Sequence, residues 1–382
     1  MSLFENLFWI SLLGSGYSYF IYPFILLLFQ SHDYIDYSKR NETKKNPTIT
    51  IIITAYNEAA QIENKIKNTL EADYDFQLLE ILIASDGSTD ATNDIIESYK
   101  EHGVTLVSVP DRKGKENAQL HAIQQAKGKI LVFSDVATQV EPTSLNRIAH
   151  VFQNPIIGAI SSEDRFLNSD GELAGEGAYV KYEMWLRKLE SSANSLVGLS
   201  GSFFSCRSTL CKNWNISIPS DFNTVINCVQ QGYVAITDPK LLGYYPNIKD
   251  ESKEYQRKVR TVLRGMAAFA HHKSLLSPFK HGFFTFQLLS HKLMRWLVPW
   301  FMLLTLLLNL ILLDQHLIYS VVLLTQLAFY LIAIMGHLSV SLRQNKVIKV
   351  IYFFVQVNLA IAHAMIMFML GKRITQWEPS KR

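Results

Sequence analysis

The chain has 382 residues, of which 48% are hydrophobic and 18% are charged. Its 37 lysines and arginines nearly balance 33 aspartates and glutamates, and the resulting net charge of +4 does not indicate a nucleic-acid partner. The 3 cysteines are an odd number without metal-ligand spacing, which indicates reduced thiols rather than a disulfide framework or a zinc site.

The hydrophobic residues are concentrated in long segments. Segments long and apolar enough to cross a bilayer, which takes about 20 residues, lie at 7–29, 296–313, 317–340 and 350–370. The first lacks a basic leader and a small-residue cleavage site, so we expect a retained anchor rather than a signal peptide. A basic cluster at 39–45 follows it, and the positive-inside rule then predicts that the soluble block faces the cytoplasm.

The basic tail at 372–382 complicates this topology. If all the apolar segments cross the bilayer, the tail lies outside, against the positive-inside rule. Either the tail is an exception or the last segment does not cross fully. The polar residues of that segment, Gln356, Asn358 and His363, fit the second reading, but they also suit contacts with other helices.

Strand-like and helix-like patterns alternate in the soluble block. Apolar runs typical of strands lie at 49–54, 78–84, 104–109 and 130–133, and helix-like segments lie at 58–71, 89–101 and 114–127. This alternation predicts an α/β domain with a mostly parallel sheet and helices on both faces.

The first two predicted strands end in polar motifs. The first runs into Tyr56-Asn57-Glu58, and the second runs into Asp86, with Asp90 shortly after. Because ligands of open α/β sheets bind outside the carboxyl ends of the strands, we expect these residues to share one crevice. Oxygen acceptors of this kind suit the imide and hydroxyls of a nucleoside. Asp86 and Asp90 also suit helix capping, but two such motifs about 30 residues apart are typical of a βα repeat with a shared site.

Two further motifs follow at the same predicted edge. Residues 111–117 place Arg112, Lys113, Lys115 and a glycine at a helix start, which suits a pyrophosphate, although a solvated basic turn has the same composition. The strand at 130–133 leads to Asp135, which is the third strand-end carboxylate.

Later segments carry the remaining soluble candidates. The helix-like segment 175–189 contains Trp185, which could stack on a sugar or belong to a core. A small-residue turn containing Gly201 enters a strand at 198–207. Asp221 opens the helical stretch 221–231, either as a functional acid or as an N-cap.

Two basic helical segments precede the second apolar segment. Arg257, Arg260 and Arg264 are spaced three and four apart, so they share one helix face, which suits a diphosphate or a solvated surface. Residues 278–295 mix aromatic and basic residues, and we expect an amphipathic helix at the membrane interface.

In this order, the motifs resemble the membrane-bound family 2 glycosyltransferases with a GT-A nucleotide-sugar domain. The resemblance covers nearly the whole chain, and its group includes the bacterial cellulose, hyaluronan and poly-N-acetylglucosamine synthases. It implies an inverting transfer of a sugar from a nucleotide sugar, expected to be UDP-linked, to a polysaccharide or lipid-linked acceptor. It further implies an enzyme of the inner membrane, with a cytoplasmic catalytic domain and with partner subunits of a polysaccharide export system.

The resemblance also implies roles for individual residues. The nucleotide sugar would be bound by Tyr56, Asn57, Glu58, Asp86, Lys113, Lys115, Gly201, Arg257 and Arg260. Asp135 would hold Mg²⁺ or Mn²⁺, Asp221 would be the catalytic base, and Trp185 would contact the acceptor.

The chain departs from the family pattern at four positions, one of which is Arg257 in place of a glutamine. Ala137 stands where a second metal ligand is usual, Ser220 replaces an acid before Asp221, and Thr261 replaces a tryptophan that contacts the polymer in processive members. Non-processive transfer to a polyprenyl phosphate and a non-catalytic partner of a synthase therefore remain alternatives. A nucleotidyltransferase would share the strand-end acids and the metal, but it would not explain Asp221 and the arginine helix.

The expected organisation has five parts. They are a membrane anchor at 1–32, a GT-A domain at 46–275, an interface helix at 276–295, transmembrane helices at 296–371 and a basic tail at 372–382.

Overall fold

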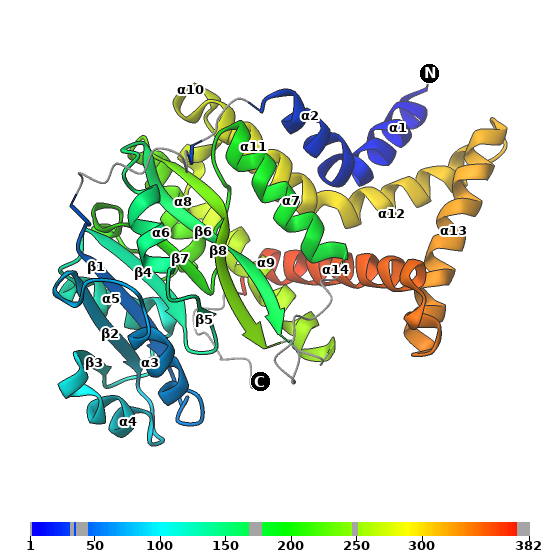
Figure 1. The fold of residues 1–382 in the computed structure, drawn as a ribbon. Coiled ribbons are helices and arrows are strands. Elements are labelled where there is room, and N and C mark those ends of the chain that lie inside the picture. Colours follow the sequence, from blue (N-terminus) through cyan, green and yellow to red (C-terminus); the bar gives the residue numbers. More distant parts are fainter. Residues whose placement is uncertain (1, 31–33, 36–44, 168–177, 247–250, 373–382) are drawn as a thin grey trace. The chain divides into compact units, whose positions relative to one another are not determined.

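The computed structural model describes residues 2–30, 34–35, 45–167, 178–246 and 251–372 (Figure 1). The chain divides into two compact units. One, here called the helical unit, contains residues 1–28, 250–266 and 285–373, and the other, called the sheet unit, contains 29–249, 267–284 and 374–382. One unit boundary, between residues 266 and 267, falls inside the arginine-containing helix Glu251–His271.

The sheet unit is an α/β fold, as predicted. The strands are β1 (Ile49–Ala55), β2 (Leu79–Asp86), β3 (Val104–Val109), β4 (Ile130–Asp135), β5 (Gln139–Val140), β6 (Ile157–Leu167), β7 (Phe203–Arg207) and β8 (Val234–Pro246). They form one sheet in the order β3-β2-β1-β4-β7-β6-β8-β5. The pairs β1–β2, β2–β3, β1–β4 and β6–β8 are parallel, so the sheet is mostly parallel.

Helices cover both faces of this sheet (Figure 1). They are α3 (Ile62–Leu70), α4 (Thr92–Ser98), α5 (Lys115–Gln125), α6 (Ser144–Val151), α7 (Ala178–Ala193) and α8 (Ser220–Gln230). Ile51 and Ile53 of β1 belong to a core cluster that also contains Ile66 of α3 and Ile148 of α6. Every residue of β1 is buried, which explains why its sequence is continuously apolar rather than alternating.

The predicted strands agree closely with the structure, whereas the helices are shorter. The segment 89–101 forms a helix only from Thr92 to Ser98, because Asp90 forms a turn in which its Oδ1 accepts a hydrogen bond from the backbone N–H of Thr92 at 3.0 Å. Gly103, with φ of +83°, ends the short 3-10 turn that follows.

The helical unit contains the apolar helices. In the described residues, four helices are long and apolar enough to cross a membrane: Leu3–Leu28, Phe283–Leu312, Leu317–Leu338 and Lys346–Met369. They comprise α1 (Leu3–Gly16) with α2 (Tyr22–Leu28), α11 (Phe283–Leu288) with α12 (Met294–Leu312), α13 (Leu317–Leu338) and α14 (Lys346–Met369). These helices confirm the predicted apolar segments and indicate membrane association.

The second of these helices differs from expectation. Residues 276–295 were expected to form a separate interface helix, but only Pro278–His281 forms the separate helix α10. Gly282, with φ of +53°, ends α10. A new helix begins at Phe283 and continues through a π-helical turn into α12. The apolar helix therefore starts well before residue 296.

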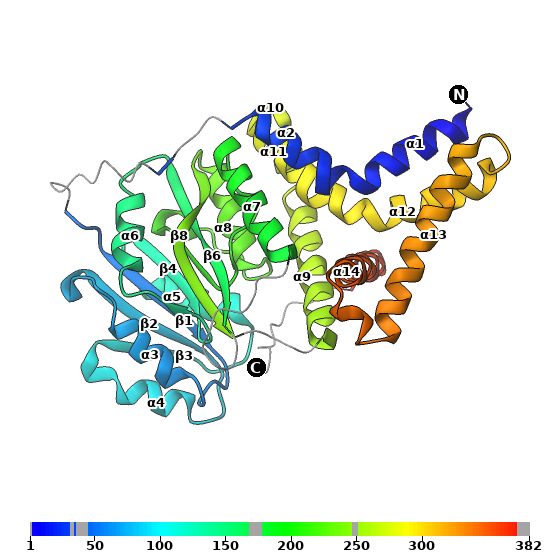
Figure 2. The same cartoon turned by 45° about the vertical axis from the view of Figure 1, so that its right-hand side comes forward.

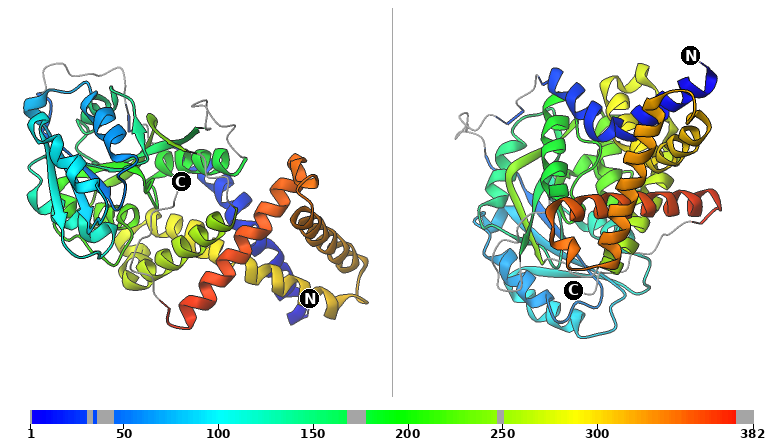
Figure 3. Two further views of the ribbon diagram at one scale, coloured as in Figure 1. Left: turned by 90° about the horizontal axis from the view of Figure 1, so that it is seen from below. Right: turned by 90° about the vertical axis from the view of Figure 1, so that its right-hand side faces the viewer.

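Close packing joins the first and second apolar helices (Figure 2, Figure 3). A Cβ at Gly14 would lie 2.7 Å from the ring of Phe301, so only glycine permits this approach. The hydroxyl of Thr305 donates to Ser11 Oγ at 2.9 Å. Small residues and polar contacts of this kind are typical of helix association in membranes.

Candidate active site

The carboxyl ends of β1 and β2 lie side by side, as predicted, because the two strands are parallel and Ala55 pairs with Ser85. Asn57 Oδ1 accepts from the backbone N–H of Thr89 at 2.8 Å, and the backbone N–H of Asn57 donates to Ser88 Oγ at 3.1 Å. Asn57 has φ of +51°, a left-handed conformation that asparagine tolerates better than most residues. The two strand-end motifs are thus joined directly.

Asp90 supports this junction structurally. Its carboxylate accepts from the backbone N–H of Ala59 at 3.1 Å and from that of Thr92 at 3.0 Å. The backbone N–H of Glu58 donates to the hydroxyl of Thr92 at 2.8 Å. Asp90 and Thr92 therefore place the Tyr56-Asn57-Glu58 turn beside the start of α4.

Asp86 connects the crevice to the basic turn. This residue is only 1% exposed, and its carboxylate accepts from the backbone N–H groups of Lys113 at 3.0 Å and Gly114 at 2.8 Å. The approach is close, because a Cβ at Gly87 would lie 2.9 Å from the backbone nitrogen of Arg112. Asp86 thereby holds the basic turn against the strand ends, a function that the sequence analysis did not predict.

Arg112 is one of the three cations of the predicted pyrophosphate turn, but its contact with Tyr56 was not predicted. Its guanidinium lies over the ring of Tyr56, 4.0 Å from the centroid. The side chain of Lys113 is largely exposed, and its Nζ lies 3.4 Å from Asp111 Oδ2. The two neighbouring cations therefore differ, since Arg112 stacks on Tyr56 and Lys113 reaches solvent.

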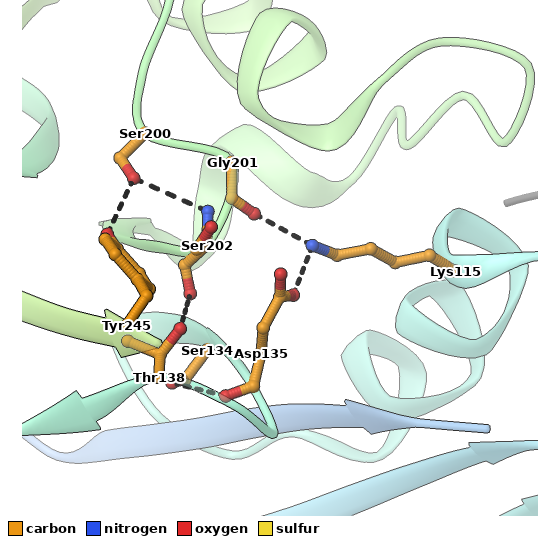
Figure 4. Close-up of polar contacts among 8 residues, drawn as sticks. All are labelled: Lys115, Ser134, Asp135, Thr138, Ser200, Gly201, Ser202 and Tyr245. Carbon is orange, nitrogen blue, oxygen red and sulfur yellow. Dashed lines mark hydrogen bonds and ion pairs between the residues drawn. The ribbon is translucent and has the colours of Figure 1, made fainter. Parts of the chain in front are cut away.

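Asp135, at the end of β4, forms an ion pair with Lys115 at the start of α5 (Figure 4). The Lys115 Nζ lies 2.5 Å from Asp135 Oδ1 and donates to the carbonyl of Gly201 at 2.8 Å. The side chains are 9% and 19% exposed, respectively. One ammonium group thus joins the strand-end carboxylate to the 200–202 turn.

A second lysine, Lys65, supports the same region from inside the fold. It is 2% exposed, on the buried face of α3, and its Nζ donates to the carbonyl of Thr138 at 2.5 Å. Burial lowers the pKa of Lys65 to about 7, an effect that the nearby Asp135 carboxylate partly offsets. Lys65 was not predicted as a site residue. The sequence signal for it is its position on the helix face that Ile62, Ile66 and Thr69 share, because a lysine on a buried face needs a polar partner.

The 200–202 turn is held by a polar cluster behind it (Figure 4). Asp164 Oδ1 accepts hydrogen bonds from Ser200 Oγ at 2.7 Å and from the Tyr245 hydroxyl at 2.5 Å. Burial and the neighbouring Asp164 raise the pKa of Tyr245 well above its ordinary value, so its hydroxyl remains a donor. Asp164 and Tyr245 were not predicted, because they lie far from Ser200 in the sequence.

Asp221 faces this turn from the first turn of α8. A Cβ at Gly201 would lie 3.9 Å from Asp221 Cγ. Within the described residues, the half-buried Asp221 side chain has no hydrogen bond or ion pair, and the N-cap of α8 is Pro219, without a side-chain cap. Asp221 therefore does not cap the helix, and its carboxylate is available for another role.

The donor set at Asp135 can be tested for its fit to a metal. Among the described residues, no group of three or more His, Cys, Asp or Glu could hold an ion. Asp135 already binds a cation in the form of the Lys115 ammonium. Asp135 offers a single carboxylate, so a Mg²⁺ or Mn²⁺ ion held there would need its other ligands from substrate phosphates and water, as is usual for Mg²⁺ in proteins.

Three candidates are not joined to this site by the contacts described. Trp185 on α7 is 42% exposed, with its ring 5.9 Å from that of Tyr182. Arg257 pairs with Glu254 at 2.8 Å on α9 (Glu251–His271), and Arg260 lies on the same helix, in the helical unit. Their roles remain predictions.

Comparison with known proteins defines the class. Residues 50–207 match the model of glycosyl transferase family 2, and this region contains β1 to β4, Asp135 and Gly201. Residues 50–207 therefore match a family 2 glycosyltransferase domain, as the motifs predicted.

Two curated relatives are similar to part of the chain. The chain is 27% identical over 208 residues to a poly-β-1,6-N-acetyl-D-glucosamine synthase of Staphylococcus epidermidis, covering 53% of this chain and 47% of the relative. It is 28% identical over 160 residues to that of Staphylococcus aureus strain COL, covering 41% and 38%. The match thus spans about half the length of these relatives or less.

The fold resembles that of a mannosyltransferase from Pyrobaculum calidifontis, solved in complex with GDP-Man and Mn²⁺. The TM-score is 0.74 at 20% identity, and the alignment covers 97% of this chain and 100% of that chain. This likeness confirms the predicted GT-A fold.

Proposed function

We propose that this protein is a membrane-bound inverting glycosyltransferase that transfers a sugar from a UDP-linked nucleotide sugar to a polysaccharide or lipid-linked acceptor. One observation carries the proposal: the Asp221 carboxylate, without a hydrogen-bond partner in the described residues, faces Gly201, whose carbonyl holds the lysine paired with Asp135. Asp221 and the lysine paired with Asp135 thus both lie next to Gly201, which supports a base and a diphosphate site close together.

The nucleoside would bind at the ends of β1 and β2. Tyr56, Asn57 and Glu58 supply the aromatic face and the oxygen and nitrogen groups that recognise a base and a ribose. Asp86 holds the basic turn beside them through two backbone N–H groups. The synthase names of the relatives favour an N-acetylhexosamine as the transferred sugar.

The diphosphate would lie near Asp135, Lys115 and Lys113. With the diphosphate present, Asp135 would hold Mg²⁺ or Mn²⁺, which supplies positive charge against the leaving group. The complex of the mannosyltransferase with Mn²⁺ supports a divalent ion in this fold. Lys115 would add a fixed positive charge, and Arg257 and Arg260 would contribute two more from α9.

Asp221 would remove the proton from the acceptor hydroxyl as that oxygen attacks the anomeric carbon. A base must come within hydrogen-bond reach of the proton it abstracts, and Gly201 leaves open the space in front of the carboxylate because it has no side chain. A single base on the face opposite the leaving group explains inversion of configuration. Trp185 is proposed as an acceptor contact.

One observation favours a second candidate, the transfer of a single sugar to a polyprenyl phosphate. Thr261 occupies the position of the polymer-contacting tryptophan, and its hydroxyl donates to the carbonyl of Arg257 at 2.9 Å, so it offers no stacking surface. A phosphate acceptor is already an anion and needs no base. Asp221 would then be dispensable.

The proposed organisation is a multi-pass protein of the inner membrane with its catalytic domain in the cytoplasm, working with other subunits of an export system. The four apolar helices and the basic segment at 39–45 support this arrangement.

The decisive experiment incubates membranes containing the protein with a panel of radiolabelled nucleotide sugars, and then sizes the product and extracts it for lipid. A high-molecular-weight product from one UDP-sugar is expected. A short lipid-extractable product would support the second candidate, and no product from any donor would contradict both.

A further inference from the structure

The cation already bound to Asp135 has a consequence for metal binding. Lys115 Nζ contacts Asp135 Oδ1 at 2.5 Å and the carbonyl of Gly201 at 2.8 Å, so it lies between two oxygens that could serve as metal ligands. The side chain is nine-tenths buried, which restricts the movement of the ammonium group. Hydrogen bonds to a charged group of this kind are stronger than those between neutral groups.

The local charge opposes a second cation. Asp135 contributes one negative charge and Lys115 one positive charge, while Lys65 lies near enough to interact with the Asp135 carboxylate. Among the described residues, no group of three or more His, Cys, Asp or Glu could hold a metal ion. A divalent ion approaching Asp135 would therefore meet the ammonium of Lys115 at short range in a partly desolvated site, where charge repulsion is weakly screened.

A nucleotide diphosphate changes this balance. Its phosphate oxygens carry negative charge and can accept hydrogen bonds from a lysine ammonium as well as bind a metal. Lys115 is the first residue of α5, and the backbone N–H groups at that end also favour an anion. The same ligand thus offers new partners to Lys115 and new ligands to a metal.

We propose that Lys115 is the resident cation of Asp135 and suppresses divalent-metal binding until a nucleotide diphosphate is present. This inference rests on the proposed function, since it assumes that the diphosphate binds beside Asp135. It makes metal and nucleotide mutually dependent ligands: each strengthens the binding of the other by the same factor. Lys115 is a positioning residue in this scheme, and its effect is measurable without any turnover.

The test measures Mn²⁺ binding to the purified full-length protein in detergent by the electron paramagnetic resonance signal of free Mn²⁺, with and without UDP. The wild type is expected to bind Mn²⁺ at least about tenfold more tightly with UDP, a coupling in the usual range. Lys115→Met is expected to bind Mn²⁺ alone at least about tenfold more tightly than the wild type, because Asp135 loses its competing partner.

Three further variants control the interpretation. Lys115→Arg retains the positive charge and should keep Mn²⁺ binding weak. The double variant Lys115→Met with Asp135→Asn should lose the higher Mn²⁺ affinity of the Lys115→Met variant, which would show that the ion binds to Asp135. Lys67→Met removes a lysine from an exposed pair with Glu63, at 2.8 Å, and should leave Mn²⁺ binding unchanged.

Two outcomes would overturn the inference: equal Mn²⁺ affinity of the wild type with and without UDP while UDP binds, or a folded Lys115→Met protein that binds Mn²⁺ no better than the wild type. If that variant does not fold, the wild-type comparison can still overturn the inference. Failure of the proposed function has a different signature, because UDP would then bind to neither the wild type nor any variant, with or without Mn²⁺.

Discussion

Replacement of Asp221 by asparagine separates the proposed chemistry from the fold. The variant keeps the shape of the side chain but removes the charge that would accept the proton. The structure predicts a small effect on stability, because in the described residues this carboxylate makes no hydrogen bond or ion pair. The main loss is the favourable interaction of a negative charge with the N-terminal turn of α8, which amounts to about 0.3–1 kcal/mol.

The effect on transfer should be much larger. Removal of a general base costs about 10²–10⁴ in rate, which corresponds to roughly 3–5 kcal/mol in the activation barrier. Binding of UDP should be near normal, because the nucleoside candidates lie on β1 and β2 rather than on α8. A drop in rate without a loss of UDP affinity would identify an interaction made only in the transition state.

The assay combines radiolabelled sugar transfer with UDP calorimetry and thermal unfolding. Asp94→Asn is the matched control, since Asp94 is an exposed acid in the first turn of α4 and should change stability by a similar small amount without changing transfer. Normal transfer by the Asp221→Asn variant would refute the reasoning and would favour an anionic acceptor. Simultaneous loss of UDP binding would make the residue structural.

The remaining predictions concern the metal, the topology and the buried lysine. Transfer should require Mg²⁺ or Mn²⁺, and Asp135→Ala should abolish it; full activity in excess EDTA would contradict this. Reporter fusions at Asn46 should locate this flank in the cytoplasm, and an external signal there would reverse the proposed topology. A fusion at Arg382 shows whether the last apolar helix crosses the membrane. Because burial lowers the pKa of Lys65 from 10.5 to about 7, the unfolded chain binds more protons between these values. The free energy of unfolding should therefore rise with pH from about 7 upward, by at most about 1.4 kcal/mol per pH unit. This rise should be absent in Lys65→Met. The prediction is contradicted if the unfolding temperatures of the wild type and of Lys65→Met change with pH in the same way from pH 7 to 9.

The expectations that the structure confirms rest on local sequence patterns. The apolar run of β1 predicts a strand covered on both faces, because a buried parallel strand cannot alternate with polar residues. The end of each run places Asn57, Asp86 and Asp135 at the carboxyl ends of neighbouring strands, since parallel strands share that edge. The long apolar segments predict the four helices by length and composition alone.

The alternative readings of single residues could be decided only in the folded chain. Asp90 and Asp221 have the same capping propensity in the sequence, and neither is an N-cap in the structure. Asp90 instead accepts hydrogen bonds from the backbone of Ala59 and Thr92, whereas Asp221 accepts none in the described residues. The difference comes from the neighbouring backbone, because a carboxylate accepts such hydrogen bonds only when unpaired N–H groups lie within its reach.

Sequence by itself therefore determined the first four strands, the helices between them and the strand-end acids, because each depends on residues close together in the chain. Tertiary structure decided which charges meet. Lys115 contacts Asp135 and Gly201, Lys65 reaches the carbonyl of Thr138, and Tyr245 donates to Asp164. These partners are separated by 20 to 86 residues, and no local pattern encodes such pairs, since their contacts arise only when the sheet brings distant strands and helices together.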